Sequence, residues 1–223
     1  MNVTSRSLHQ KYRQLLIVLV ANFCVSPFLK VGIESLASAF LLFYTLIVII
    51  RSFSLPKFLV SVYTAIAFIA FFLQISAIMG WLAFPEQSLE LVPQVIFVIY
   101  LGAAAYWIGR DIFTTSRVTL DTVQGGISIY LLIGYVWALF YSMISTLDAD
   151  AFSQSLLARG YFLQSLYFSF TTLTTLGYGD IVPVSDVALV FSNLEAIMGQ
   201  MYSTVFIAIL VGGYLAQHSN NHQ

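Results

Sequence analysis

Long apolar segments alternate with short polar connections along almost the whole chain. A helix needs about 20 mostly apolar residues to cross a bilayer. Six segments reach or approach that length: residues 14–29, 33–50, 58–84, 91–109, 122–147 and 186–216. Helix-breaking residues are expected to mark the connections, namely Gly32, Pro56, Pro85 and Pro93. The pattern predicts an all-α membrane protein with six transmembrane helices.

A seventh apolar segment, residues 164–175, is too short to cross the membrane. A helix that ends at membrane depth is tolerated only where protein or a water-filled cavity surrounds it. We therefore expect a re-entrant half-helix between the last two spans. This arrangement divides the chain into a four-span bundle with its connector (1–121), a pore domain (122–216) and a short tail (217–223).

The composition agrees with a membrane protein and excludes several other classes. Hydrophobic residues make up 59% of the chain and charged residues 9%, whereas a soluble domain carries about 25% charged residues. The net charge of −1 gives no attraction to nucleic acid. Cys24 is the only cysteine, which excludes an intrachain disulfide and a multi-cysteine metal site. No pairing of a nucleophile with a base, phosphate-binding loop or cofactor motif stands out, so no enzyme is predicted.

Basic residues predict the orientation, because Lys and Arg are enriched in cytoplasmic loops. If the six spans alternate, seven of the nine basic residues fall on one side: Arg6, Lys11, Arg13, Arg51, Lys57, Arg110 and Arg117. This side should be cytoplasmic and should hold both termini. The outer loops are acidic, which would raise the cation concentration there. The expected location is the plasma membrane, in a bacterium the inner membrane.

The segment 171–180 reads Thr-Thr-Leu-Thr-Thr-Leu-Gly-Tyr-Gly-Asp. Glycine tolerates positive φ, so Gly177 and Gly179 permit the alternating backbone that turns successive carbonyls the same way. The segment resembles the selectivity filter of potassium channels, usually Thr-Val-Gly-Tyr-Gly-Asp, with Leu176 in place of valine. The resemblance implies a filter of Thr175, Leu176, Gly177, Tyr178 and Gly179. The carbonyls of its first four residues would replace the hydration shell of K⁺.

One chain supplies one such loop, whereas a closed ring needs four. We therefore expect a homotetramer with cyclic symmetry. K⁺ would be the permeant ion and not a cofactor, and the membrane lipid and the other three subunits would be the partners. The half-helix would point the negative end of its dipole toward the pore and favour a cation there.

The same resemblance suggests residues that support the filter. Many relatives carry two tryptophans in the half-helix, where this chain has Tyr167 and Phe168. Phe168 has no N–H to donate, so the Tyr178 hydroxyl needs another partner, for which Thr172 is the candidate. Some relatives bond the filter aspartate from a half-helix carboxylate, and the matching residue here is Thr171.

Tyr167 could donate to Asp180 instead. This contact would replace the carboxylate that the half-helix lacks.

Two residues of the last span are further candidates. Gly199 lies 20 residues after Gly179, the spacing at which relatives place a gating hinge, although a glycine for close helix packing is an equal alternative. Glu195 is a carboxylate well inside a span, and such groups usually face the bundle interior with a partner. It is expected to bond half-helix hydroxyls behind the filter, either in gating or as a structural polar lock. The cavity below should include some of Thr204, Ile207, Ala208 and Val211.

The fourth span, residues 91–109, contains no Lys or Arg. A voltage sensor needs a row of such charges, so the chain resembles six-span potassium channels without a charged sensor. We predict weak voltage gating, with Arg110 as an interfacial anchor. A non-selective cation channel, a K⁺ transporter subunit and a non-conducting modulatory subunit are the alternatives. His218 and His222 are expected to lie in a flexible tail.

Overall fold

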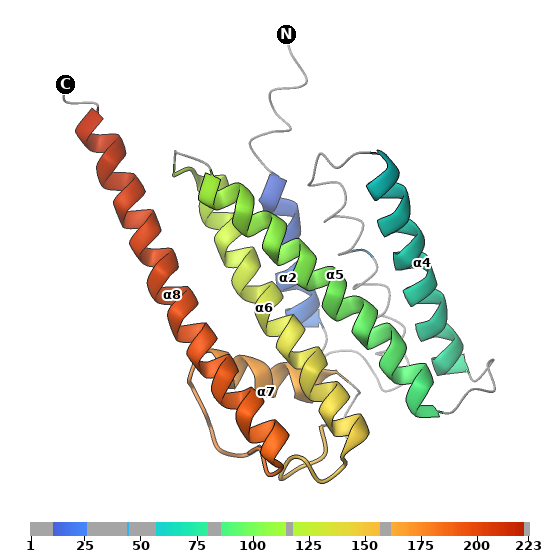
Figure 1. The fold of residues 1–223 in the computed structure, drawn as a ribbon. Coiled ribbons are helices and arrows are strands. Elements are labelled where there is room, and N and C mark those ends of the chain that lie inside the picture. Colours follow the sequence, from blue (N-terminus) through green and yellow to red (C-terminus); the bar gives the residue numbers. More distant parts are fainter. Residues whose placement is uncertain are drawn as a thin grey trace.

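The computed structural model describes residues 11–25, 44, 57–79, 86–114, 118–156 and 162–220. Six helices account for most of these residues (Figure 1). They are α2 (Lys11–Val25), α4 (Lys57–Met79), α5 (Glu86–Thr114), α6 (Leu120–Leu147), α7 (Leu163–Leu173) and α8 (Asp186–Asn220). The described part of the chain is therefore helical, as the apolar pattern predicts.

Three of the described helices are long and apolar enough to cross a membrane: Leu91–Ile112, Leu120–Leu147 and Asp186–Gly213. Shorter apolar stretches occupy Tyr12–Val25 and Thr64–Leu73. The second expected span, residues 33–50, lies outside the described residues except at position 44. By length and composition, the described residues thus contain three candidate spans, and the full number of six stays a prediction.

Pro93 lies inside α5, which begins at Glu86, so the prediction that this proline marks a connection is wrong. A proline removes one helical hydrogen bond and crowds only the turn before it. Membrane helices tolerate this change because neighbouring groups satisfy the freed carbonyl. Helix α5 also begins several residues before position 91, where hydropathy places the start of the fourth span.

Helix α6 is the centre of the fold and packs against α2, α5, α7 and α8. Thr119 caps its first turn, with reciprocal hydrogen bonds between Thr119 and Thr122. Apolar side chains of α2, α5 and α6 form one buried core: Leu15, Leu19, Phe97, Leu101, Ile108, Leu132 and Tyr135. Packing of this kind fixes α6, and α6 in turn supports the short helix α7.

The first described helix also reaches the half-helix. The Tyr135 hydroxyl of α6 donates to the Leu19 carbonyl of α2 at 3.1 Å. The ring of Phe23 in α2 meets that of Phe170 in α7 edge-on, with centroids 5.1 Å apart. Helix α2 therefore contacts both α6 and the short helix α7.

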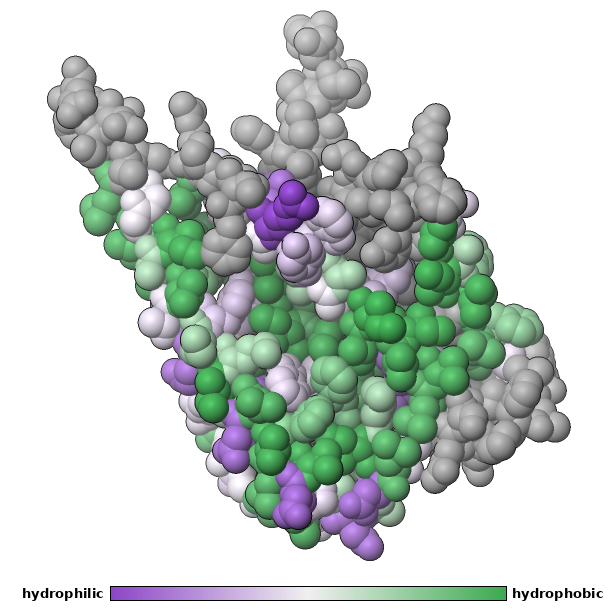
Figure 2. Space-filling view, viewed as in Figure 1, coloured by the Kyte–Doolittle hydropathy of each residue, from purple (hydrophilic) through white to green (hydrophobic). Residues whose placement is uncertain are grey.

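Different elements lie at the two ends of the molecule. The start of α2 and the last turns of α8 lie at one end, and α7 with the loop after it lies at the other (Figure 1). Between them, the face shown in Figure 2 is apolar over most of its area, and hydrophilic residues lie toward its ends and along the edge formed by α8. This distribution suits a protein whose middle is surrounded by hydrocarbon.

The loop that precedes α7 pairs with the loop that precedes α8. Ser153 N donates to the Val182 carbonyl at 2.9 Å, and Val184 N donates to the Ala151 carbonyl at 2.8 Å. Phe152 and Pro183 form an antiparallel bridge between these contacts. Backbone hydrogen bonds therefore hold residues 182–184, just after position 180, against the loop that precedes α7.

Candidate functional site

The loop 174–180 leaves the C-terminal end of α7 with hydrogen bonds to the last turn of that helix. Thr175 N donates to the Thr172 carbonyl at 2.9 Å, and Gly177 N donates to the Thr171 carbonyl at 3.1 Å. The Thr174 hydroxyl donates to the Phe170 carbonyl at 2.6 Å. These bonds satisfy carbonyls that a helix end leaves without partners, and they fix where the loop begins.

Every second residue of this loop has a left-handed backbone. The φ angles are +57° at Thr175, +53° at Gly177 and +80° at Gly179, whereas Leu176 and Tyr178 between them are not left-handed. Alternation of this kind turns successive carbonyls in a common direction, unlike a strand, where they point to opposite sides. The two glycines adopt this geometry without steric cost.

Thr175 adopts a positive φ although it is β-branched, which costs about 1–3 kcal/mol and persists only where the surroundings hold it. One such contact comes from α8, where Gln200 Nε2 donates to Thr175 Oγ1 at 3.1 Å. The backbone bond from Thr175 N to Thr172 is another. The conformation at the base of the loop thus depends on both α7 and α8.

Tyr167 connects the half-helix to the end of the loop. Its hydroxyl donates to Asp180 Oδ2 at 2.8 Å, which is the contact expected from the sequence. Its ring also stacks on Tyr178, with centroids 6.2 Å apart and planes inclined by 5°. Desolvation and then the hydrogen bond to Asp180 raise the pKa of the Tyr167 hydroxyl, so the hydroxyl stays a donor at neutral pH.

Phe168 and Thr171 lie behind the loop. Phe168 is buried and meets Tyr141 and Phe152 edge-on, with centroids 4.8 Å and 5.1 Å apart. Phe168 thus contributes aromatic packing and no hydrogen bond, because its side chain has no donor. The Thr171 hydroxyl donates to the Phe168 carbonyl at 2.9 Å, within its own helix.

The expected hydrogen bond from Tyr178 to Thr172 is not formed among the described residues of one chain. The Tyr178 side chain is 68% exposed, and its ring lies flat against Tyr167. The aromatic contact of Tyr178 that the structure shows within one chain is therefore with Tyr167.

Glu195 is fully buried between α8, α6 and α7. Tyr141 Oη lies 2.6 Å from Glu195 Oε2, and Ser169 Oγ lies 2.5 Å from Glu195 Oε1. Ser169 belongs to α7, so the prediction that Glu195 bonds a half-helix hydroxyl is confirmed. Its role in gating stays a prediction.

At Gly199, helix α8 comes very close to the end of α7. A Cβ atom added there would overlap the Leu173 carbonyl oxygen, and the Tyr130 hydroxyl donates to that same oxygen at 3.4 Å. Helix α8 continues through this position to Asn220. The packing alternative for Gly199 therefore has direct support, and the hinge stays a prediction.

The family model described as "Ion channel" matches residues 95–212, more than half of the chain. The chain belongs to this ion-channel family. The match includes most of α5 and all of α6, α7 and the loop after it. Because this is a family of channels, the expectation that the protein is not an enzyme is confirmed.

Individual relatives of the channel are potassium channels. The voltage-gated delayed rectifier potassium channel KCNH5 of Homo sapiens is 44% identical over 46 residues, which are 20% of this chain and 5% of the human protein. The two pore potassium channel a of Oryza sativa subsp. japonica is 28% identical over 108 residues, which are 48% of this chain and 28% of the rice protein. The chain thus spans less than a third of either relative. No solved structure matches it.

Sequence reasoning missed three polar side chains of the channel that contact the site. These are Gln200, which bonds Thr175, Tyr141, which bonds Glu195, and Gln154, whose Nε2 donates to the Asp180 carbonyl at 2.8 Å. Gln200 and Tyr141 are polar groups within apolar spans, and that was the available signal. Gln154 lies in a loop where nothing in the sequence distinguishes it.

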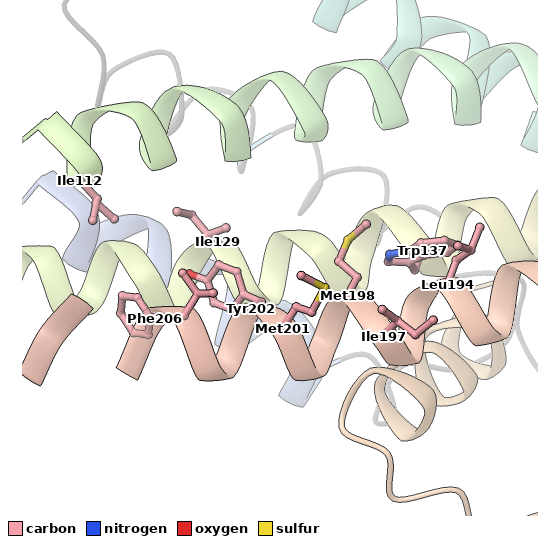
Figure 3. A pocket seen from close by; sticks show the side chains of 10 residues that line it. Ile112, Ile129, Trp137, Leu194, Ile197, Met198, Met201, Tyr202 and Phe206 are labelled. Atoms are coloured by element: carbon pink, nitrogen blue, oxygen red, sulfur yellow. The ribbon is translucent and has the colours of Figure 1, made fainter. Parts of the chain in front are cut away.

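An apolar cavity of about 590 Å³ lies between α6 and α8, away from the filter-like loop (Figure 3). Side chains of the two helices face it, with Ile112 of α5 at one end. They are Ile112, Ile129, Trp137, Leu194, Ile197, Met198, Met201, Tyr202, Val205 and Phe206. Its lining is almost entirely apolar and includes none of residues 174–180.

Replacing Tyr167 by phenylalanine is expected to speed the loss of conduction during maintained opening by roughly two- to tenfold, the range for one hydrogen bond. The variant keeps the ring that stacks on Tyr178 but loses the donor to Asp180. Macroscopic currents at constant voltage would measure the rate. Tyr106→Phe is the matched control, because Tyr106 is exposed on α5. An unchanged rate in Tyr167→Phe would count against a role of this hydrogen bond.

Proposed function

We propose that this channel conducts K⁺ passively and selectively through a pore lined by residues 175–179 of four subunits. The observation that supports this most directly is the alternation of left-handed residues at Thr175, Gly177 and Gly179. The potassium-channel relatives add independent support. A passive pore fits the absence of any nucleotide-binding or catalytic motif in the sequence.

In the proposed mechanism a dehydrated K⁺ moves between rings of backbone carbonyls. The carbonyls of Thr175, Leu176, Gly177 and Tyr178, with the Thr175 hydroxyl, take the place of water around the ion. The negative end of the α7 dipole lowers the energy of the cation on the inner side of the filter. Gln200, Tyr167 and the half-helix keep the loop in its alternating form.

The exposed surface of a single chain supports assembly into a homotetramer. Leu176 and Tyr178 are 56% and 68% exposed, although filter side chains have to pack against something for the carbonyls to stay in place. Helix α8 is the least buried of the three apolar spans. It presents large apolar side chains on several faces: Val190, Leu194, Ile197, Met201, Val205, Ile207 and Val211. Neighbouring subunits and lipid would cover these groups.

The proposed setting is the plasma membrane, with both termini in the cytoplasm and the filter facing outward. The basic loops favour this orientation. In the structure the start of α2 and the end of α8 lie at the end opposite the loop after α7, which is compatible with it (Figure 1).

The test of this function is single-channel recording of the purified full chain in planar bilayers with K⁺ on one side and Na⁺ on the other. A reversal potential near the K⁺ equilibrium value is expected. A reversal potential near zero would favour a non-selective cation channel instead. One observation would fit a non-selective channel: among the described residues of one chain, the Tyr178 hydroxyl does not bond Thr172, its expected partner.

The same recordings test the absence of a voltage sensor. Residues 91–109 carry no basic charge, and Arg110 at their end lies over the Trp107 ring, 5.5 Å from its centroid. Moving one charge through the field supplies about 2.3 kcal/mol per 100 mV, and a sensor uses about 3–4 charges per subunit. We expect less than about one charge per subunit here. A steep conductance–voltage curve in symmetric K⁺ would contradict this prediction.

A further inference from the structure

Glu195 joins three helices at one buried point behind the filter-like loop. Its side chain has no exposed surface and receives contacts from Tyr141 of α6 and Ser169 of α7. Neither partner is basic, and the described residues contain no ion pair to this carboxyl group. A buried carboxylate without a positive partner is strongly disfavoured, and such groups usually become neutral instead.

The number of protons available for the hydrogen bonds around Ser169 also favours a neutral Glu195. Ser169 Oγ lies 2.8 Å from the Gly134 carbonyl oxygen and 2.5 Å from Glu195 Oε1. A serine hydroxyl has one proton to donate. The Gly134 carbonyl can only accept, and an ionised Glu195 could also only accept. With a carboxylate, one proton would have to serve two acceptors.

A protonated Glu195 removes this conflict. Its O–H donates from Oε1 to Ser169 Oγ, and the Ser169 proton then goes to the Gly134 carbonyl. The Tyr141 hydroxyl donates to Oε2, which remains an acceptor. Every group then has the proton that it needs, which is the condition for a stable buried polar network.

The position of this network relates it to the filter. Ser169 and Leu173 are one turn apart on α7, and their contacts on α8, Glu195 and Gly199, are also one turn apart. The next contact in the same direction joins Thr175 to Gln200. These three contacts form a register between the half-helix and α8 that ends at the first filter residue.

The geometry points to Glu195 as a positioning residue that works as a neutral carboxylic acid. It donates its proton to Ser169 and so sets the register of α7 on α8 on which the filter depends. The positioning part of this inference rests on the proposed conduction of K⁺, whereas the protonation part does not.

Infrared spectroscopy of the purified full chain in lipid tests the protonation without any current. The carbonyl stretch of a carboxylic acid lies apart from the amide and carboxylate bands. Isotope-labelled glutamate should shift one such band at neutral pH, and the band should be missing from Glu195→Gln. Its absence from the native protein would overturn the neutral state.

Variants test the positioning. Glu195→Gln keeps one donor and one acceptor in the same shape, so its K⁺ to Na⁺ permeability ratio and open lifetime should stay within about twofold of the native values. Glu195→Leu and Ser169→Ala leave buried groups without partners and should lower the ratio or the lifetime at least about tenfold. Ser128→Ala is the matched control, because Ser128 is as fully buried as Ser169 and its hydroxyl donates to the Gln124 carbonyl of its own helix at 2.8 Å.

The outcomes separate the two parts of the inference. If Glu195→Gln is as impaired as Glu195→Leu, two acceptor oxygens are required and the neutral acid is wrong. If Glu195→Leu keeps native permeation, the positioning role is wrong. If Glu195→Leu does not assemble, recovery of the thermal stability of the assembled protein in Glu195→Gln supports the neutral acid, and failure to recover it contradicts it. A native protein that passes no K⁺ refutes the proposed function and leaves the infrared result to decide the protonation.

Discussion

Replacing Gly177 by alanine is expected to abolish K⁺ conduction while leaving the helices folded. Gly177 has a φ of +53°, and within the described residues no atom beyond its two chain neighbours lies within 4 Å of where its Cβ would be. The obstacle is therefore the backbone conformation and not a collision within the subunit. A left-handed conformation costs an L-residue about 1–2 kcal/mol, or about 4–8 kcal/mol for the proposed ring of four subunits.

That cost applies only to the alternating form of the loop, so the ring of four should relax to another backbone conformation. The carbonyls on either side of position 177 would then turn away from the axis. Single-channel recordings should show no K⁺ current from Gly177→Ala protein, although size-exclusion chromatography and circular dichroism should show native assembly and helix content.

Gly102→Ala is the matched control for this prediction. Gly102 lies in α5 with no atom within 4 Å of its Cβ position, and its φ is not positive. Alanine is better than glycine inside a helix by about 1 kcal/mol, so this variant should conduct like the native channel. Native K⁺ current from Gly177→Ala would contradict the carbonyl mechanism.

The half-helix could be predicted closely because two independent signals agree there. An apolar stretch too short to span the membrane ends in a cluster of threonines, and the structure places α7 at Leu163–Leu173 against the expected 164–175. Hydropathy also placed α6 and α8, because both are long apolar segments. It misplaced the start of α5, because the helix begins with residues 86–90, which are mostly polar and carry no hydropathy signal.

How well a contact within the site could be predicted depends on how the two residues are related along the chain. The Tyr167–Asp180 bond could be predicted because the resemblance fixes the spacing of half-helix and filter. The Tyr178–Thr172 bond could not be settled in the same way, because spacing along the chain does not show that the Tyr178 ring stacks on Tyr167. The bonds of Gln200 and Tyr141 depend on how α8 crosses α7 and α6. Side-chain packing sets such crossings, and the order of residues along one helix does not show them.

Replacing Gly199 by alanine is expected to prevent correct assembly of the pore. The added methyl group would overlap the Leu173 carbonyl oxygen, which is main chain at the end of α7 and cannot swing away as a side chain would. Overpacking of this kind costs about 1–3 kcal/mol per site, or about 4–12 kcal/mol over four subunits. We expect a lower melting temperature of the assembled protein and loss of K⁺ current, measured by fluorescence melting and bilayer recording.

Gly212→Ala in the same helix is the matched control, because in the described part of the chain no atom outside its own helical turn lies within 4 Å of its Cβ position. The pair of variants also separates the two roles weighed for Gly199. A pure hinge makes the opposite prediction for stability, because alanine would strengthen a straight α8 by about 0.5–1 kcal/mol. Such a variant would assemble well and open rarely. A stable Gly199→Ala assembly with brief openings would therefore establish the hinge, whereas destabilisation confined to Gly199→Ala would establish that this glycine lets α8 reach the end of the half-helix and hold the filter.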